Sequence, residues 1–316
     1  MGKWTLLPHD APQAGELWRQ LRKDGHVRVF TQLPEFSAIC SDELGWELRC
    51  LVRESSPVVV PLIIRRRRGG RAVLAESLAY GLVGGPITDR PLVDNDTRSL
   101  AGALRRTALE VVVYPGHGDF VPLGWQRMDF SVHEVTVAED SPARSQPTRA
   151  CRSAARHAER CGVWIAPITA AEQVERVAEV HRRQQKARRA RHYSGRWLMR
   201  MVTEMSGSVG LWGAFVGDRL LAAMLVGWCG GAATALLSTA DPEARPLKAG
   251  NLLYLSVLES LAERSVKTVD LGGSRNLPAL EAFKRSLGGM PVSRPYYRCR
   301  HIGLALYHTV VSPRSD

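Results

Sequence analysis

The sequence predicts an α/β protein with mixed sheets, built from two similar domains in tandem. An edge strand followed by an amphipathic helix is predicted at residues 4–21 and again at 164–184. A β-hairpin is predicted at 49–62 and again at 211–224, so both features recur about 160 residues apart. A constant offset between two different elements indicates a duplicated domain rather than a short solenoid repeat.

The second half shows the clearer order of elements. Its three central strands are expected to form an antiparallel meander with a tight turn at Gly217-Asp218, and the later strand–helix–strand unit is expected to add a parallel strand. A linker rich in Ser, Pro and charge at 138–146 separates predicted domains of residues 1–140 and 141–316. The expected elements are helices at 147–160, 170–190, 250–264 and 277–287, and strands at 162–166, 209–216, 220–228, 232–239, 266–271 and 297–304.

Composition bounds the class of protein. A length of 316 residues suggests two domains of ordinary size or one large one, and a chain that is 45% hydrophobic can form hydrophobic cores. Its apolar runs are shorter than the roughly 18–20 residues of a membrane span, and no secretory signal is visible at the start. The six cysteines lack the spacing of zinc or redox motifs, which predicts buried free thiols, no metal and a cytoplasmic protein.

Positive charge is concentrated in one segment. The formal net charge is +12, and residues 144–200 hold 14 Lys or Arg against 4 acidic residues, a local net charge of +10. Such a concentration predicts a polyanionic partner. Spacings of 3, 4 and 4 place Arg149, Arg152, Arg156 and Arg160 on one face of the predicted helix.

A second basic stripe follows on the next helix, formed by Arg182, Lys186, Arg189 and Tyr193. For both stripes the alternative is a solvated basic face without a ligand. The run of four arginines at 65–68 is interpreted as a solvated hairpin tip.

The region near the C-terminus carries the predicted chemistry. The strand at 266–271 is broken by Gly272-Gly273, and the following helix carries Phe283 and Lys284 before a second double glycine. Glycines at a strand end let a substrate approach the backbone closely. The helix then supplies an aromatic ring and a cation, which a group-transfer site can use.

Three segments resemble the GNAT acyltransferase superfamily, and within it the tandem FemABX-type peptidyltransferases. They are residues 80–86, residues 148–156 leading into Gly162, and residues 270–274 followed by Phe283-Lys284. The resemblance implies two GNAT-like domains and an aminoacyltransferase that takes aminoacyl-tRNA as co-substrate, with no cofactor. It also implies that the Phe-Lys pair lies beside the tRNA 3′ end, and that the segment from about His301 onward packs on the first domain.

Roles for individual residues follow from this resemblance and from the chemistry of ester aminolysis. Lys284 is the candidate to stabilise the oxyanion and Phe283 to stack on a terminal base, against the alternatives of a solvent-facing lysine and a core ring. Arg191, His192 and Tyr193 are candidates to line the acceptor pocket. Asp270 is a candidate to orient an amine, with a turn former as the alternative. The predicted tRNA-binding residues are Arg149, Arg152, Arg156, Arg160, Arg182, Lys186 and Arg189, and the predicted substrate-binding residues are Arg191, Tyr193, Asp270 and Ser274.

Departures from the family pattern leave the acceptor and the donor open. Residues 32–39 lack the lysine that cell-wall enzymes of the family tend to carry there, which favours a small natural-product or precursor amine, or a peptide. Residues 245–251 lack the glycine spacing that holds the pyrophosphate of CoA. The alternatives are an acyl-CoA-dependent N-acyltransferase and a non-catalytic RNA-binding protein. The protein is expected to be a monomer that uses direct attack without a covalent intermediate.

Overall fold

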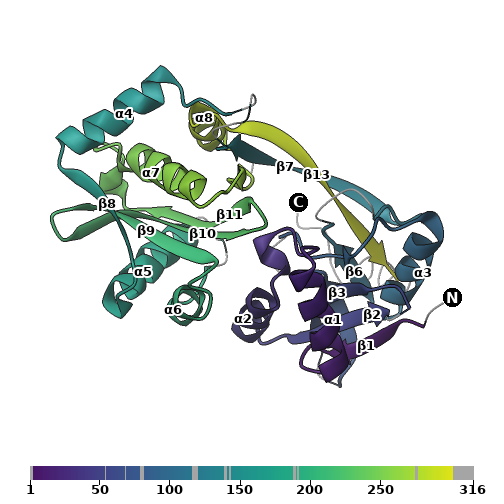
Figure 1. The fold of residues 1–316 in the computed structure, drawn as a ribbon. Helices are drawn as coiled ribbons and strands as arrows, with labels where there is room; N and C mark the ends of the chain where they lie inside the picture. Colours follow the sequence, from purple (N-terminus) through teal and green to yellow (C-terminus); the bar gives the residue numbers. More distant parts are fainter. Residues whose placement is uncertain are drawn as a thin grey trace, which may run out of the picture. The chain divides into compact units, whose positions relative to one another are not determined.

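The computed structural model describes residues 3–53, 55–67, 69–78, 82–115, 120–138, 141, 144–187, 190, 192–274 and 277–301. The chain divides into two compact units (Figure 1). Unit 1 comprises Met1–Phe130 and Pro295–Asp316, and unit 2 comprises Ser131–Arg294. The predicted domain boundary at residue 140 lies beyond this division, in the segment after β7 (Gln126–Thr136). Most of the predicted C-terminal return, residues 302–316, lies outside the described residues.

Unit 1 is a mixed sheet with helices. Its strands run in the order β1-β2-β3-β4-β6-β13, with β4 and β6 parallel and the other neighbours antiparallel. Arg65 and Arg66 end β3 and are exposed, as expected at a hairpin tip. The elements are β1 (Thr5–Pro8), α1 (Pro12–Lys23), η1 (Phe30–Gln32), α2 (Pro34–Leu44), β2 (Glu47–Arg53), β3 (Val58–Arg66), β4 (Ala72–Glu76), β5 (Ile87–Thr88), α3 (Asp94–Arg105), β6 (Glu110–Val113) and the end of β13 (Met290–Arg300).

Unit 2 has the same kind of sheet, in the order β7-β12-β11-β10-β9-β8. The predicted antiparallel meander is confirmed in β9–β10–β11, and the predicted parallel addition is confirmed in the pairing of β11 with β12. The structure adds α6, which lacked a predicted range, and starts β13 at Met290 rather than at 297. The elements are α4 (Arg149–Arg160), β8 (Val163–Pro167), α5 (Ala171–Ala187), α6 (Gly195–Glu204), β9 (Val209–Val216), β10 (Arg219–Cys229), β11 (Ala232–Ala240), η3 (Pro242–Ala244), α7 (Ala249–Glu263), β12 (Thr268–Asp270) and α8 (Pro278–Ser286).

The predicted duplication is confirmed by the order of elements. Apart from the two-residue strand β5 and the 3-10 helices η1 and η3, each repeat runs strand, helix, helix, three strands, helix and strand, from β1 to β6 and from β8 to β12. The strands that follow are exchanged. β7, which comes after β6 in the chain, pairs with β12, and β13, which comes after β12, pairs with β6.

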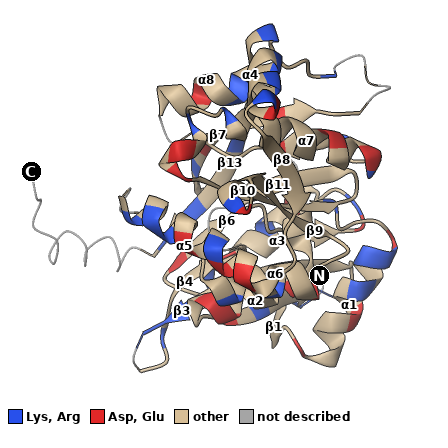
Figure 2. Cartoon of the chain, turned by 90° about the vertical axis from the view of Figure 1, so that its left-hand side faces the viewer, with Lys and Arg blue, Asp and Glu red and all other residues tan. Residues whose placement is uncertain are grey.

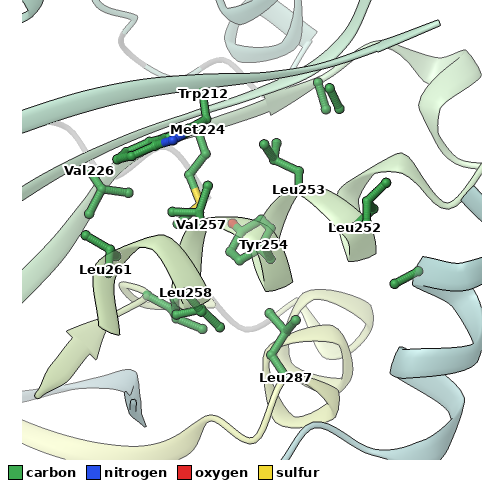
Figure 3. Close-up of a cluster of buried hydrophobic side chains, with 14 of the residues drawn as sticks. Trp212, Met224, Val226, Leu252, Leu253, Tyr254, Val257, Leu258, Leu261 and Leu287 are labelled. Carbon is green, nitrogen blue, oxygen red and sulfur yellow. The ribbon is translucent and has the colours of Figure 1, made fainter. Parts of the chain in front are cut away.

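The core of unit 2 is centred on α7. Tyr254, Val257 and Leu261 on this helix are buried, and Figure 3 shows α7 side chains between Met224 of β10 on one side and Leu287 on the other. α4 packs on the same core through small side chains, Cys151, Ala155 and Ala158. Because those three residues occupy the inner face of α4, its arginines are left on the outer face.

Within the described residues, every helix is too short or too polar to span a bilayer. The same part of the chain contains no group of three or more His, Cys, Asp or Glu side chains that could hold a metal ion. The six cysteines are free thiols, of which Cys40, Cys50 and Cys151 are buried and the other three partly exposed.

Candidate active site

The candidate site is the end of β12 in unit 2. β12 pairs with β11 over three residues and stops at Asp270, while β11 continues to Ala240. Gly272 adopts a left-handed φ of 74°, and its N–H donates to Asp270 Oδ1 at 2.6 Å. A Cβ on Gly273 would lie 3.0 Å from the carbonyl oxygen of Ser131. The double glycine therefore allows a tight turn that runs close against β7.

Lys284 is buried at this turn. Its side chain comes from α8, is 3% exposed, and donates from Nζ to the carbonyl oxygens of Gly272 at 2.8 Å and Gly273 at 2.9 Å. The alternative of a solvent-facing lysine is therefore wrong. A lysine ammonium has three N–H donors, so one is left after these two bonds among the described residues and is available to a ligand. Burial lowers the pKa of Lys284 to about 8, and the charge of Asp270 opposes that shift.

His133 on β7 is a member of this site that the sequence did not predict. Its main chain pairs with the strand end, because Leu271 N–H donates to the His133 carbonyl at 2.8 Å and His133 N–H donates to the Gly272 carbonyl at 3.2 Å. Its Nδ1 lies 3.5 Å from Ser274 Oγ, and both residues are buried. Burial and the neighbouring charge of Lys284 lower the pKa of His133, which favours a neutral imidazole at pH 7.

Asp270 is held by partners on both sides. Besides the Gly272 N–H, its Oδ2 lies 3.5 Å from Arg294 Nη2, and Arg294 also pairs with Glu134. Burial raises the pKa of Asp270, while the charge of Arg294 and the Gly272 N–H act in the opposite direction. The geometry therefore gives Asp270 a turn-forming role at the strand end.

Phe283 precedes Lys284 on α8 and packs against the core. Its ring meets Tyr254 edge to face, with ring centroids 5.1 Å apart. Phe283 is half-buried and packs against the core of unit 2, which agrees with the alternative prediction of a core ring. Part of the side chain is still accessible. Burial raises the pKa of Tyr254, and a hydrogen bond with Ser238 opposes this shift.

The basic stripe of α4 begins beside α8. Thr148 caps α4 through its side chain, which accepts from Cys151 N–H at 3.2 Å, and its own N–H donates to the Ser286 carbonyl at the end of α8 at 2.9 Å. Figure 2 shows the Lys and Arg positions along α4. The four stripe arginines are exposed and form no ion pair with any described residue: Arg149, Arg152, Arg156 and Arg160.

The second predicted stripe lies on α5. Arg182 and Lys186 are exposed, whereas Arg189 and Arg191 lie outside the described residues. Tyr193 stacks on Trp197 at 4.0 Å and on His181 at 5.6 Å between ring centroids. These contacts place Tyr193 in the α5–α6 cluster rather than at the β12 strand end.

Comparisons with known proteins agree with this architecture. Residues 146–285 match the family model described as Acetyltransferase (GNAT) domain, and no curated protein matches the chain. Among solved structures, FemX has a TM-score of 0.68 at 11% identity, covering 93% of this chain and 98% of FemX. The C-terminal domain of a putative lysylphosphatidylglycerol synthetase from Agrobacterium fabrum has a TM-score of 0.60 at 13% identity, covering 94% and 96%.

A third solved structure has the same tandem organisation. The tandem GNAT protein from the clavulanic acid biosynthesis pathway has a TM-score of 0.54 at 15% identity, covering 94% of this chain and 98% of that one. At these identities the likeness is one of fold, and the family match lies within the second unit. The chain therefore has a tandem GNAT fold like that of FemX and of the clavulanic acid pathway protein, and its residues 146–285 match a GNAT acetyltransferase domain.

Proposed function

We propose that the protein transfers an amino acid from aminoacyl-tRNA to an amine and so forms an amide bond. The observation that carries this proposal is the anchoring of the α4 arginine stripe beside α8, the helix that buries Lys284 at the β12 strand end. An exposed row of unpaired arginines suits a phosphate backbone, and the adjacent ammonium suits a reacting ester.

The reaction needs few groups from the protein. The neutral amine of the acceptor attacks the ester carbonyl, a C–N bond forms, and the C–O bond to the ribose breaks. The proton lost by the amine ends on the ribose oxygen. The third N–H of Lys284 is available to hydrogen-bond the developing oxyanion, while its other two hold the Gly272 and Gly273 carbonyls in place.

The loop before α7 lacks the glycine spacing of a CoA pyrophosphate site, which supports tRNA over CoA as donor. A pyrophosphate site at a helix N-terminus needs free main-chain N–H groups. Here Ala244, Arg245, Lys248 and Asn251 donate theirs to carbonyls of the same loop, and Pro246 has none. The N–H groups of Leu247, Ala249 and Gly250 form no such bond within the described residues. The CoA-dependent reaction remains the alternative on this fold. We place the reaction in the cytoplasm, where aminoacyl-tRNA is made, with a small molecule or peptide as the acceptor and a monomeric enzyme.

A donor assay tests the proposal. We expect amide product from an aminoacyl-tRNA pool and a panel of small amines, and no product after the tRNA has been treated with RNase. Acyl-CoA should not support turnover. Turnover with acyl-CoA alone would overturn the proposal in favour of an N-acyltransferase. Binding of tRNA with steep salt dependence but no product from either donor would favour a non-catalytic RNA-binding protein.

A further inference from the structure

Unit 1 contains a small polar pocket that the proposed reaction does not use. Its polar lining comes from His26, Arg28, Gln32, Thr88 and Arg90, and its volume is about 40 Å³. One water molecule needs roughly 10–15 Å³ on the same measure, so the pocket has room for a group of several atoms. It is a cavity for a chemical group rather than for a whole drug-sized ligand.

The charge of the lining is positive. None of the described lining residues is acidic. Arg28 forms no ion pair with any described residue. Arg90 lies 3.9 Å from Asp96, but Asp96 is already paired with Arg53 at 2.8 Å. Two guanidinium groups therefore border the pocket with little compensating negative charge from the described residues, which favours an anion.

Gln32 adds an oriented hydrogen-bond donor. It is 5% exposed, and its main-chain carbonyl accepts from Trp18 Nε1 at 3.0 Å. Its side-chain Oε1 accepts from the N–H of Arg28 at 3.1 Å, which fixes the amide with Nε2 as the free donor. No described residue accepts a hydrogen bond from Nε2. Because Gln32 lines the pocket, Nε2 is available to an acceptor atom of a ligand there.

The other side of the pocket is held by local contacts. Thr88 Oγ1 donates to the carbonyl of Arg90 at 2.9 Å, and Arg90 Nη2 donates to Ser56 Oγ at 3.2 Å. Phe120 is fully buried and contributes an apolar wall. These contacts position Arg90 at the rim without using all five of its N–H donors.

We propose that this pocket binds one oxyanion group, a phosphate or a carboxylate, of a small ligand. Arg28 and Arg90 supply the charge, and Gln32 Nε2 supplies a directed hydrogen bond. The proposal concerns unit 1 by itself and does not depend on the donor used in the proposed aminoacyl transfer, so either can fail without the other.

The test is calorimetric titration of the full chain at low ionic strength with inorganic phosphate and, separately, with acetate. We expect saturable binding that Arg28→Gln weakens about tenfold or more, since a hydrogen bond to a charged group contributes about 1.5–3 kcal/mol. Gln32→Glu should weaken it further by adding a negative charge. The matched control is Arg98→Gln on α3, an exposed arginine outside the pocket, which should bind as the wild type does.

The outcomes separate the two sources of the oxyanion. Binding of phosphate but not acetate assigns a phosphorylated ligand, and the reverse assigns a carboxylate. Circular dichroism of Arg28→Gln, an exposed position, checks that the fold is intact. No saturable binding of either anion, or equal affinity in Arg28→Gln and the wild type, would overturn the proposal.

Discussion

The residues that follow the parallel strand pair differ between the two repeats, where the pairs are β4–β6 in unit 1 and β11–β12 in unit 2. In unit 1, β6 is followed by Tyr114, whose ring stacks on Tyr296 with centroids 5.2 Å apart and meets Phe130 edge to face at 6.3 Å. The Tyr114 carbonyl accepts from Gly84 N–H at 3.1 Å, and Ser77 Oγ accepts from the Tyr114 N–H at 2.9 Å. Aromatic rings and a crossing loop thus occupy the strand end.

In unit 2 the corresponding strand end is polar. β12 is followed by Gly272-Gly273, whose carbonyls accept from the buried ammonium of Lys284. The same succession of elements therefore supports packing in one repeat and a buried charge in the other. The difference indicates that the duplicated fold sets where a strand ends, while a few residues after that end decide whether chemistry is available there.

Of the changes that test this difference between the two strand ends, replacement of Lys284 should have the largest effect on kcat. We expect Lys284→Met to lower kcat by about 10²- to 10³-fold, as removal of one oxyanion donor does in other enzymes, with tRNA affinity unchanged. Single-turnover kinetics and filter binding measure the two quantities. The matched control is Lys267→Met, an exposed lysine in the same unit, which should keep wild-type kcat. A near-normal kcat in Lys284→Met would show that the buried ammonium has only a structural role.

The exposed arginines of α4 in unit 2 and the ion-paired arginines of α1 in unit 1 offer a second contrast. We expect the double change Arg152→Gln and Arg156→Gln to weaken tRNA binding about tenfold and to reduce the slope of log K against log salt by about 1.5–2. The control changes Arg19 and Arg22 on α1, which already pair with Glu16 and Glu35, to Gln. Equal salt slopes in both double variants would show that α4 is only a solvated face.

The pH dependence of turnover should report Lys284 directly. Its pKa is lowered to about 8, so the ammonium is lost as pH rises through that value, and the rate per neutral amine should fall about tenfold per pH unit above it. Lys284→Arg keeps its charge, so any residual activity should lack this falling limb. The profile is measured by rapid quench with correction for spontaneous ester hydrolysis. A flat wild-type profile from pH 7 to pH 10 would contradict a catalytic ammonium.

The sequence predicted the succession of elements in both repeats because strand and helix periodicities are local. It did not predict the environment of Lys284. In α8 Lys284 is the fully buried position, the reverse of what an amphipathic pattern suggests for lysine, and its acceptors are main-chain carbonyls across a turn. The membership of His133 depends on β7 pairing with β12, a non-local contact that no local pattern reveals.

The exchanged strands were missed for a related reason. Pro291 and Pro295 interrupt the strand pattern of β13, since proline cannot donate to a ladder, and the sequence therefore placed the strand start too late. The choice of partner for β7 and β13 depends on tertiary packing, which the alternation of polar and apolar residues leaves undetermined.

Two glycines allow the packing at the two units to be compared. A Cβ on Gly289 in unit 2 would lie 2.7 Å from the carbonyl oxygen of Lys284, whereas Gly102 in α3 has nothing within 4 Å. We expect Gly289→Ala to destabilise unit 2 by about 1–3 kcal/mol through overpacking. Gly102→Ala should stabilise unit 1 by about 0.5–1 kcal/mol, because alanine loses less entropy in a helix. Hydrogen exchange of peptides from each unit measures both, and a stabilising Gly289→Ala would contradict the tight fit.

The smallest expected effect on kcat is that of a change at Tyr114, after the end of β6. Burial, with the charge of Glu76 adding to it, raises the pKa of Tyr114 to about 12, so its hydroxyl stays protonated at every pH where turnover is measured. Tyr114→Phe keeps the stacking on Tyr296 and removes only that hydroxyl, and kcat should stay within about twofold of wild type. Single-turnover kinetics beside Lys284→Met provide the measurement. A tenfold loss of kcat in Tyr114→Phe would show that the end of β6 also contributes to catalysis. The two strand ends would then not differ in the way proposed.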